Sequence, residues 1–239
     1  MGVSPRAVLA AVVVTACISS CDAAPPPEAA PAARSDLTVN QVGGCIQADE
    51  ATLEVYEDDE VTAVVALMGH GRAGVVVSYE ENGSVCNWLA AAERLAEAGY
   101  TVLLYDRLRG NEGAFVPAMT SLIRQRGVQN VALLGGTIGG AISISEAVFL
   151  QPPPSAVVSL AGADSGTVRV AGQLPSPLLQ VVARKDPALE AAVDTHGAAG
   201  PRGHRLIVLP GNAHASMLFP VHAKALWAIE RFLRRVMPP

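Results

Sequence analysis

The chain has 239 residues, half of them hydrophobic and 4% aromatic, with a formal net charge of −5. This length is enough for one sizeable buried core. The mild acidity and the scattered Lys and Arg residues argue against a nucleic-acid partner. Three cations that do cluster, Arg231, Arg234 and Arg235, fall in a predicted C-terminal helix, where positive charge suits the helix dipole.

The first residues are typical of an export signal. A short basic start, MGVSPR, precedes the apolar run AVLAAVVVTACISSC, which is too short to span a bilayer as a mature helix. The pattern resembles a bacterial lipoprotein signal, in which a cysteine after a small residue becomes lipid-modified. Both Cys17 and Cys21 fit, and Cys21 is preferred because it leaves the longer apolar region and directly precedes the linker. A plain secretory signal or an uncleaved anchor are the alternatives.

We therefore predict a signal peptide over residues 1–21, a Pro/Ala-rich extended linker over 22–44, and a single domain over 45–239. The expected location is the bacterial cell envelope, with membrane contact through the N-terminal lipid only. Two cysteines remain in the mature chain, Cys45 and Cys86. In an exported protein such a pair indicates one disulfide, and two buried unpaired thiols are the alternative.

From about residue 50, predicted strands alternate with predicted helices. Strands are expected at 51–57, 61–68, 74–79, 101–106, 131–134, 156–162, 177–183 and 204–210. Helices are expected at 88–99, 116–127, 138–150, 188–196 and 221–236. This alternation predicts a mostly parallel sheet with helices on both faces, and the first two strands supply an antiparallel edge hairpin.

The stretch GHGRAG, residues 69–74, matches a dinucleotide-binding fingerprint. That motif requires a helix next, because the pyrophosphate binds a helix N-terminus. The residues that follow, VVVSY, favour a strand instead. We therefore predict a hairpin turn here and set a nicotinamide-dependent enzyme aside.

The stretch VALLGGTIGG, residues 131–140, places a threonine between a strand and a helix rich in small residues. This arrangement is typical of a nucleophile elbow, where the nucleophile has positive φ and flanking side chains would collide. Gly135 and Gly139 occupy the flanking positions, and Thr137 occupies that of the nucleophile.

Two further candidates follow in order along the chain. Asp186 comes after the strand in PLLQVVARKDP, and His214 lies in the loop after the last predicted strand, LIVLPGNAHASM. Nucleophile, acid and histidine in this order match the α/β-hydrolases. Residues 53–236 resemble that family. Within them, VVVSYEENGSVCNWLAAAERLAEAGYTVLLYDRLRGNEG resembles the stretch of exported bacterial members that contains a Cys-x-Trp segment, occupied here by Cys86 and Trp88.

The resemblance implies a three-layer α/β sandwich around a mostly parallel twisted sheet. It implies that Asp186 orients His214, which takes the proton from the hydroxyl of Thr137. The backbone N–H of Ile138 and a second donor near Glu80 would form the oxyanion hole. No cofactor and no metal are implied.

Four features depart from the family pattern. The nucleophile is Thr, the residues after the third strand are Tyr79 to Glu81 in place of His-Gly or His-Gln, and DRLRG is one residue longer than the family's turn. Residues 161–177 are too few for a large lid. The carboxylates of Glu80 and Glu81 would oppose the charge in an oxyanion hole unless they point away.

Two hypotheses of different classes follow. The first is a lidless, lipid-anchored hydrolase of small esters or related acyl compounds that works weakly through a Thr-His-Asp triad. The second is a catalytically inactive member that serves as a binding or interaction module at the cell envelope. The sequence favours the first because Asp186 and His214 are retained.

Overall fold

The computed structural model describes residues 41–201 and 203–239. The predicted signal peptide, the lipidation candidates Cys21 and Cys17, and most of the predicted linker lie outside these residues. The folded part begins before the predicted boundary at Cys45. Strand β1 (Gln41–Val42) pairs with β2 (Ile46–Gln47), and Val42 is buried, so these residues belong to the domain.

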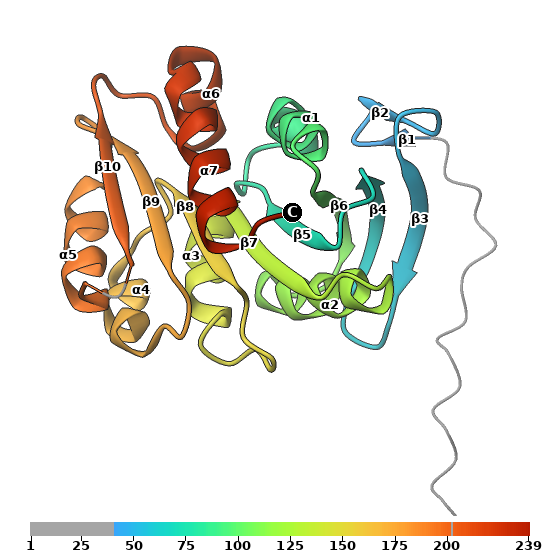
Figure 1. Cartoon of the computed structure of the whole chain (residues 1–239), viewed down its shortest axis with the longest axis horizontal. Helices are drawn as coiled ribbons and strands as arrows, with labels where there is room; N and C mark the ends of the chain where they lie inside the picture. Colours follow the sequence, from blue (N-terminus) through green and yellow to red (C-terminus); the bar gives the residue numbers. More distant parts are fainter. Residues whose placement is uncertain (1–40, 202) are drawn as a thin grey trace, which may run out of the picture. The chain divides into compact units, whose positions relative to one another are not determined.

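Within the described residues, the centre of the domain is an eight-stranded sheet in the order β10-β9-β8-β7-β5-β6-β4-β3, which can be followed from left to right in Figure 1. Strand β4 is antiparallel to both of its neighbours, and all other pairs are parallel. The predicted fold, with its antiparallel edge hairpin, is confirmed. The strands are β3 (Thr52–Glu57), β4 (Thr62–Met68), β5 (Ala73–Ser78), β6 (Thr101–Arg109), β7 (Asn130–Gly136), β8 (Ala156–Leu160), β9 (Leu178–Ala183) and β10 (Arg205–Leu209).

Helices cover both faces of the sheet. One face carries α1 (Leu89–Glu97), α6 (Leu218–Val221) and α7 (Ala223–Val236), and the other carries α2 (Glu112–Gln125), α3 (Ile138–Glu146), α4 (Ser165–Val170) and α5 (Leu189–Ala199). Short 3₁₀ turns are η1 (Val85–Trp88), η2 (Ala171–Gln173) and η3 (Ala215–Met217). Trp88 and Phe232 belong to the core on the first face, and Phe115 and Ile144 to the core on the second.

The central strands are apolar on both sides because helices cover both faces. Every residue of β5, β8 and β9 is buried. Such continuous apolar runs are characteristic of parallel sheets. The carboxyl ends of these strands therefore meet at one edge, where loops can carry polar groups.

The hairpin predicted at residues 69–74 is wrong. Strand β6 lies between β4 and β5, so this segment is a crossover connection. Its glycines serve a close approach between chain segments. A Cβ on Gly71 would lie 2.0 Å from the carbonyl oxygen of Gly99, which leaves no room for any side chain. No large lid is present among the described residues, because residues 161–177 form only α4, η2 and short connections.

The predicted disulfide between Cys45 and Cys86 is present, with 5.8 Å between the two Cα atoms. It joins the β1–β2 segment to η1. Trp88 at the end of η1 is fully buried and packs edge-on against Phe219, with ring centroids 5.4 Å apart. The disulfide therefore ties the start of the described chain to a segment that is anchored in the core.

Candidate active site

Thr137 occupies a sharp turn between β7 and α3. Its backbone has φ 47° and ψ −116°, a conformation that is rare for any residue with a side chain. The two flanking glycines are required for steric reasons. A Cβ on Gly135 would lie 2.4 Å from the backbone of Gly139, and one on Gly139 would lie 2.2 Å from the carbonyl oxygen of Ser78. The turn therefore has the geometry of a nucleophile elbow.

The structure brings the three predicted polar side chains into one hydrogen-bonded chain. Thr137 Oγ1 lies 2.7 Å from His214 Nε2, and His214 Nδ1 lies 2.8 Å from Asp186 Oδ2. The other carboxylate oxygen accepts a hydrogen bond from the Ala188 N–H at 2.8 Å. The Asp186 side chain is fully buried, whereas that of His214 is 43% exposed. In the tautomer with its proton on Nδ1, the imidazole accepts from the Thr137 hydroxyl and donates to Asp186.

The loops after β9 and β10 hold the acid and the histidine together. The N–H of Lys185 donates to the carbonyl oxygen of Gly211 at 2.9 Å, which joins the Asp186 loop to the His214 loop. Directly after His214, Ala215 has φ 46°. Among the described residues, Thr137, Ala161 and Ala215 are the non-glycine residues with positive φ. Backbone strain of this kind is typical of functional sites.

The expected oxyanion donors lie around the first turn of α3. Ile138 is the first residue of that helix, so its N–H has no carbonyl partner within the helix. A Cβ on Gly139 would lie 2.8 Å from the Tyr79 carbonyl oxygen, so the backbone that leads into Glu80 runs beside this turn. The assignment of Ile138 and Glu80 as donors stays a prediction.

The Glu80 carboxylate bridges two segments that sequence analysis did not connect. It accepts a hydrogen bond from Trp88 Nε1 at 2.7 Å, and its other oxygen bonds the Ser216 hydroxyl, two residues after His214. Its negative charge is therefore engaged by donors from η1 and from the histidine loop. The neighbouring Glu81 is exposed. No sequence motif links Glu80 to Trp88 or to the distant Ser216, so sequence analysis missed this contact.

Arg107 contacts Tyr79 and Glu80, the residues that follow β5. Its guanidinium lies 3.9 Å from the centre of the Tyr79 ring and donates to the Glu80 carbonyl oxygen at 3.4 Å. It also forms an ion pair with Glu112 at the start of α2. Arg107 of β6 therefore fixes both the Tyr79 ring and the backbone carbonyl of Glu80.

A buried hydroxyl pair stabilises the end of β5. Ser78 Oγ and Tyr105 Oη lie 2.8 Å apart. Burial raises the pKa of Tyr105 to about 12, so its hydroxyl stays protonated at neutral pH. The pair therefore adds no charge beneath the site.

A small pocket of about 250 Å³ opens beside Thr137. Most of the side chains that line it are small, and one is acidic. Besides Thr137, the lining residues are Ile138, Ala141, Ala161, Gly162, Ala163 and Asp164. A pocket of this size and lining accommodates a short acyl or alkyl group. Asp164 is engaged locally, because its side chain caps α4 by accepting from the Thr167 N–H at 2.8 Å.

In residues 41–201 and 203–239, no group of three or more His, Cys, Asp or Glu side chains is arranged to hold a metal ion. Over the same ranges, no helix has the length and apolar character needed to cross a membrane.

Three solved structures with the same architecture are described as hydrolases or esterases. An esterase from Pyrococcus furiosus matches with a TM-score of 0.70 at 13% identity, over 85% of this chain and 97% of its own. An α/β serine hydrolase without a lid from Xanthomonas campestris matches with a TM-score of 0.63 at 18% identity, over 80% and 96%. A predicted CIB-like hydrolase from Thermoplasma acidophilum gives 0.67 at 14%, over 77% and 98%. With the strand order, these matches show the α/β-hydrolase fold.

By sequence, the chain belongs to the family described as the FIST N domain, whose model matches residues 11–171. The matched stretch includes Thr137 and Glu80 but ends before Asp186 and His214. Nothing in the geometry of the site accounts for this family match. No curated protein matches the sequence.

Proposed function

We propose that the protein is a hydrolase of small carboxylic esters or related acyl compounds, with Thr137 as its nucleophile. The observation that carries the proposal is the continuous hydrogen-bonded chain from Thr137 Oγ1 through His214 to the buried Asp186. Each member follows a different strand, so the three meet only because the fold brings them together. The small adjoining pocket and the absence of a lid from the described residues favour a short, freely diffusing substrate.

The geometry supports acyl transfer in two steps. Oγ1 of Thr137 attacks the substrate carbonyl while His214 Nε2 takes its proton, and Asp186 stabilises the resulting imidazolium. The oxyanion forms beside the N–H of Ile138 and the backbone near Glu80. His214 then returns the proton to the departing alcohol, and a water molecule, deprotonated by the same nitrogen, releases the acid and restores the Thr137 hydroxyl.

We further propose that the protein is exported and lipid-anchored at Cys21 in the cell envelope of a bacterium. The sequence ISSC and the Pro/Ala-rich residues that follow it support this location. The Cys45–Cys86 disulfide supports export as well, since disulfides persist in oxidising compartments.

The second candidate is a binding or interaction module without catalysis. The observation that favours it is Thr137 itself, because a β-branched residue with φ 47° is strained and its methyl group crowds the space that a carbonyl must enter. In this case the pocket beside Thr137 would bind a small ligand without turning it over.

A fluorophosphonate probe distinguishes the two candidates. A competent nucleophile displaces fluoride and leaves a phosphonyl group on Oγ1, which peptide mass spectrometry places on Thr137. The hydrolase proposal expects this adduct on the native chain, and its loss in His214→Ala and in Thr137→Ala. If neither the native chain nor Thr137→Ser is labelled while both are folded, the binding module replaces the hydrolase.

A further inference from the structure

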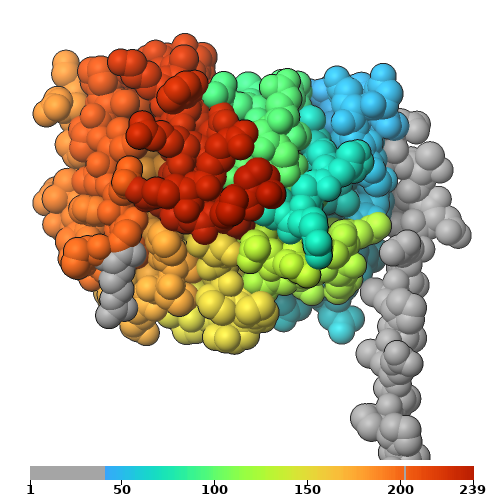
Figure 2. Space-filling view, in the orientation of Figure 1, coloured from blue at the N-terminus to red at the C-terminus, as the bar shows by residue number. Residues whose placement is uncertain are grey.

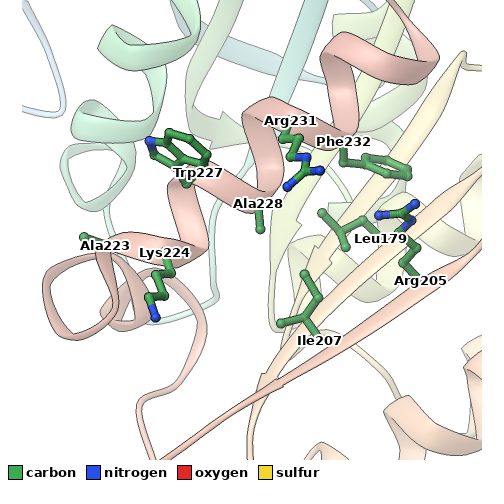
Figure 3. Close-up of a pocket in the computed structure, with 9 residues that line it drawn as sticks. All are labelled: Leu179, Arg205, Ile207, Ala223, Lys224, Trp227, Ala228, Arg231 and Phe232. Atoms are coloured by element: carbon green, nitrogen blue, oxygen red, sulfur yellow. The ribbon is translucent and has the colours of Figure 1, made fainter.

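A groove of about 610 Å³ lies between α7 and the strands β9 and β10, and none of its lining residues belongs to the candidate triad. Figure 3 shows side chains of α7 on one side of the groove and those of β9 and β10 on the other. Its floor is apolar, with Leu179, Ile207 and Phe232. Its rim carries the cations Arg205, Lys224 and Arg231. The groove therefore combines an apolar interior with a positively charged edge.

The positive charge continues into an adjoining hollow of about 360 Å³, which is lined by arginines alone: Arg205, Arg231, Arg234 and Arg235. Arg234 is paired with Glu230, which also binds Arg94. Within the described ranges, no ion pair neutralises the charges of Arg205, Lys224, Arg231 or Arg235. On a chain whose net charge is −5, this is a concentrated patch of opposite sign.

The exposed face of α7 also presents a large aromatic residue. Lys224, Arg231 and Arg235 follow one another at spacings of seven and four residues, which puts them on one stripe of the helix. Trp227 lies beside this stripe and is 63% exposed. Figure 2 shows α7, in dark red, uncovered on the face that is viewed. We name Arg205, Lys224, Trp227, Arg231, Arg234 and Arg235 the basic α7 face.

We propose that the basic α7 face is a docking surface for an anionic phospholipid bilayer. Exposed cations attract anionic headgroups, and a partly exposed indole is suited to the boundary between headgroups and acyl chains. The apolar floor of the groove offers a place for an acyl chain segment beneath the arginines. The rest of the chain carries a net negative charge and is repelled by the same bilayer, so the charge distribution also orients the domain. This surface is separate from the predicted lipid and does not depend on the hydrolase proposal.

Tryptophan fluorescence reports on this surface directly. The chain has two tryptophans, and Trp88 is fully buried, so a change in emission on vesicle binding comes from Trp227. The whole chain is used with Cys17→Ser and Cys21→Ser, so that no lipid is attached. Vesicles of equal parts phosphatidylglycerol and phosphatidylcholine are expected to shift the emission to shorter wavelength. Vesicles of phosphatidylcholine alone leave it unchanged, and high salt reverses the shift.

Charge removal gives the quantitative test. Replacing Arg231 and Arg235 with glutamine should weaken partitioning into the anionic vesicles about 30-fold, taking ~1 kcal/mol per cation and 1.4 kcal/mol per tenfold. The matched control is Arg72→Gln with Arg169→Gln. It removes the same charge from exposed positions outside the basic α7 face and should partition like the parent chain. Trp227→Phe should abolish the emission change.

Several results would overturn the proposal. One is the absence of a shift with anionic vesicles, and another is an equal shift with neutral ones. Equal weakening by the two double variants would show that only net charge matters. A shift saturated by dodecyl phosphate below its micelle concentration, but not by vesicles, would make the groove a site for single anionic amphiphiles. A shift that rises with protein concentration without vesicles would assign the surface to a second copy of the chain.

Discussion

Replacing Thr137 with serine removes one methyl group from the elbow and leaves the hydroxyl in place. The hydroxyl is already 2.7 Å from His214 Nε2, so the substitution does not have to create the proton path. What it changes is the crowding around a residue with φ 47° and ψ −116°. The β-branch restricts rotation about χ1, and its methyl group adds bulk beside the hydroxyl that an incoming carbonyl must approach.

The expected size of the effect follows from the cost of this strain. A non-glycine residue in such a backbone region costs about 1–3 kcal/mol. Serine keeps the backbone part of that cost and loses the part due to the branch, which we take as about 1.4 kcal/mol. If that amount is recovered in the transition state, hydrolysis becomes about tenfold faster. We therefore expect kcat/KM for short-chain aryl esters to rise at least about tenfold in Thr137→Ser.

The assay compares initial rates for aryl acetate and aryl butyrate. Thr52→Ser is the matched control, because it removes a methyl group from an exposed threonine on the edge strand β3 and should change nothing. Adding His214→Ala to Thr137→Ser should abolish the gain. The reasoning is refuted if Thr137→Ser is no more active than Thr137→Ala while circular dichroism and the denaturation midpoint show an intact fold.

Three further predictions concern stability and location. Glu80→Ala should lower the free energy of unfolding in urea by about 1–3 kcal/mol, because it leaves the buried Trp88 N–H without its acceptor. Glu80→Gln should lower it less, and an equal loss in the two variants would mean that the bridging contact is unimportant. Replacing Cys45 and Cys86 with serine removes a disulfide that spans a sequence separation of 41 and should lower the free energy of unfolding by ~2–4 kcal/mol. Free thiols in native exported protein would contradict the disulfide. Cys21→Ser should release the protein from membranes that are washed at high salt, which also removes attraction through the basic α7 face; release by Cys17→Ser instead would identify the other cysteine as the lipidated one.

The sheet was predictable because its signals are local. Apolar runs bounded by glycine and polar turns mark the strands, and their alternation with helices fixes a mostly parallel arrangement. Helix α2 begins four residues before its predicted start, because Asn111 caps it by accepting a hydrogen bond from the Gly113 N–H at 3.0 Å. The order of strands is not local. Nothing in residues 69–74 indicates that β6, which comes later in the chain, lies between β4 and β5.

The candidate site likewise has a part that local sequence signals predict and a part that depends on the whole fold. Thr137, Asp186 and His214 could be chosen as candidates because each follows a predicted strand and their order along the chain is informative. The partners of Glu80 could not, since Trp88 and Ser216 approach it from two loops whose meeting depends on the complete fold. The basic α7 face falls between these cases. Arg231, Arg234 and Arg235 form a visible cluster in the sequence, where they suit the helix dipole. That Arg205 and Lys224 lie near them, and that Trp227 is exposed beside them, depends on the packed fold.

The contrast between Asp186 and Glu80 bears on whether the site is active. Asp186 is fully buried, and removing a carboxylate from water costs several kcal/mol unless hydrogen bonds compensate. Its partners are one backbone N–H and His214, and that histidine turns its other nitrogen toward Thr137. A binding module needs no such arrangement, because an apolar side chain at position 186 would fill the same space at no cost in solvation. Glu80, by contrast, bonds the indole of Trp88 and the hydroxyl of Ser216, so its role in holding the histidine loop serves either function. The buried acid therefore argues for proton transfer at Thr137, whereas the acid beside the expected oxyanion hole argues only for rigidity.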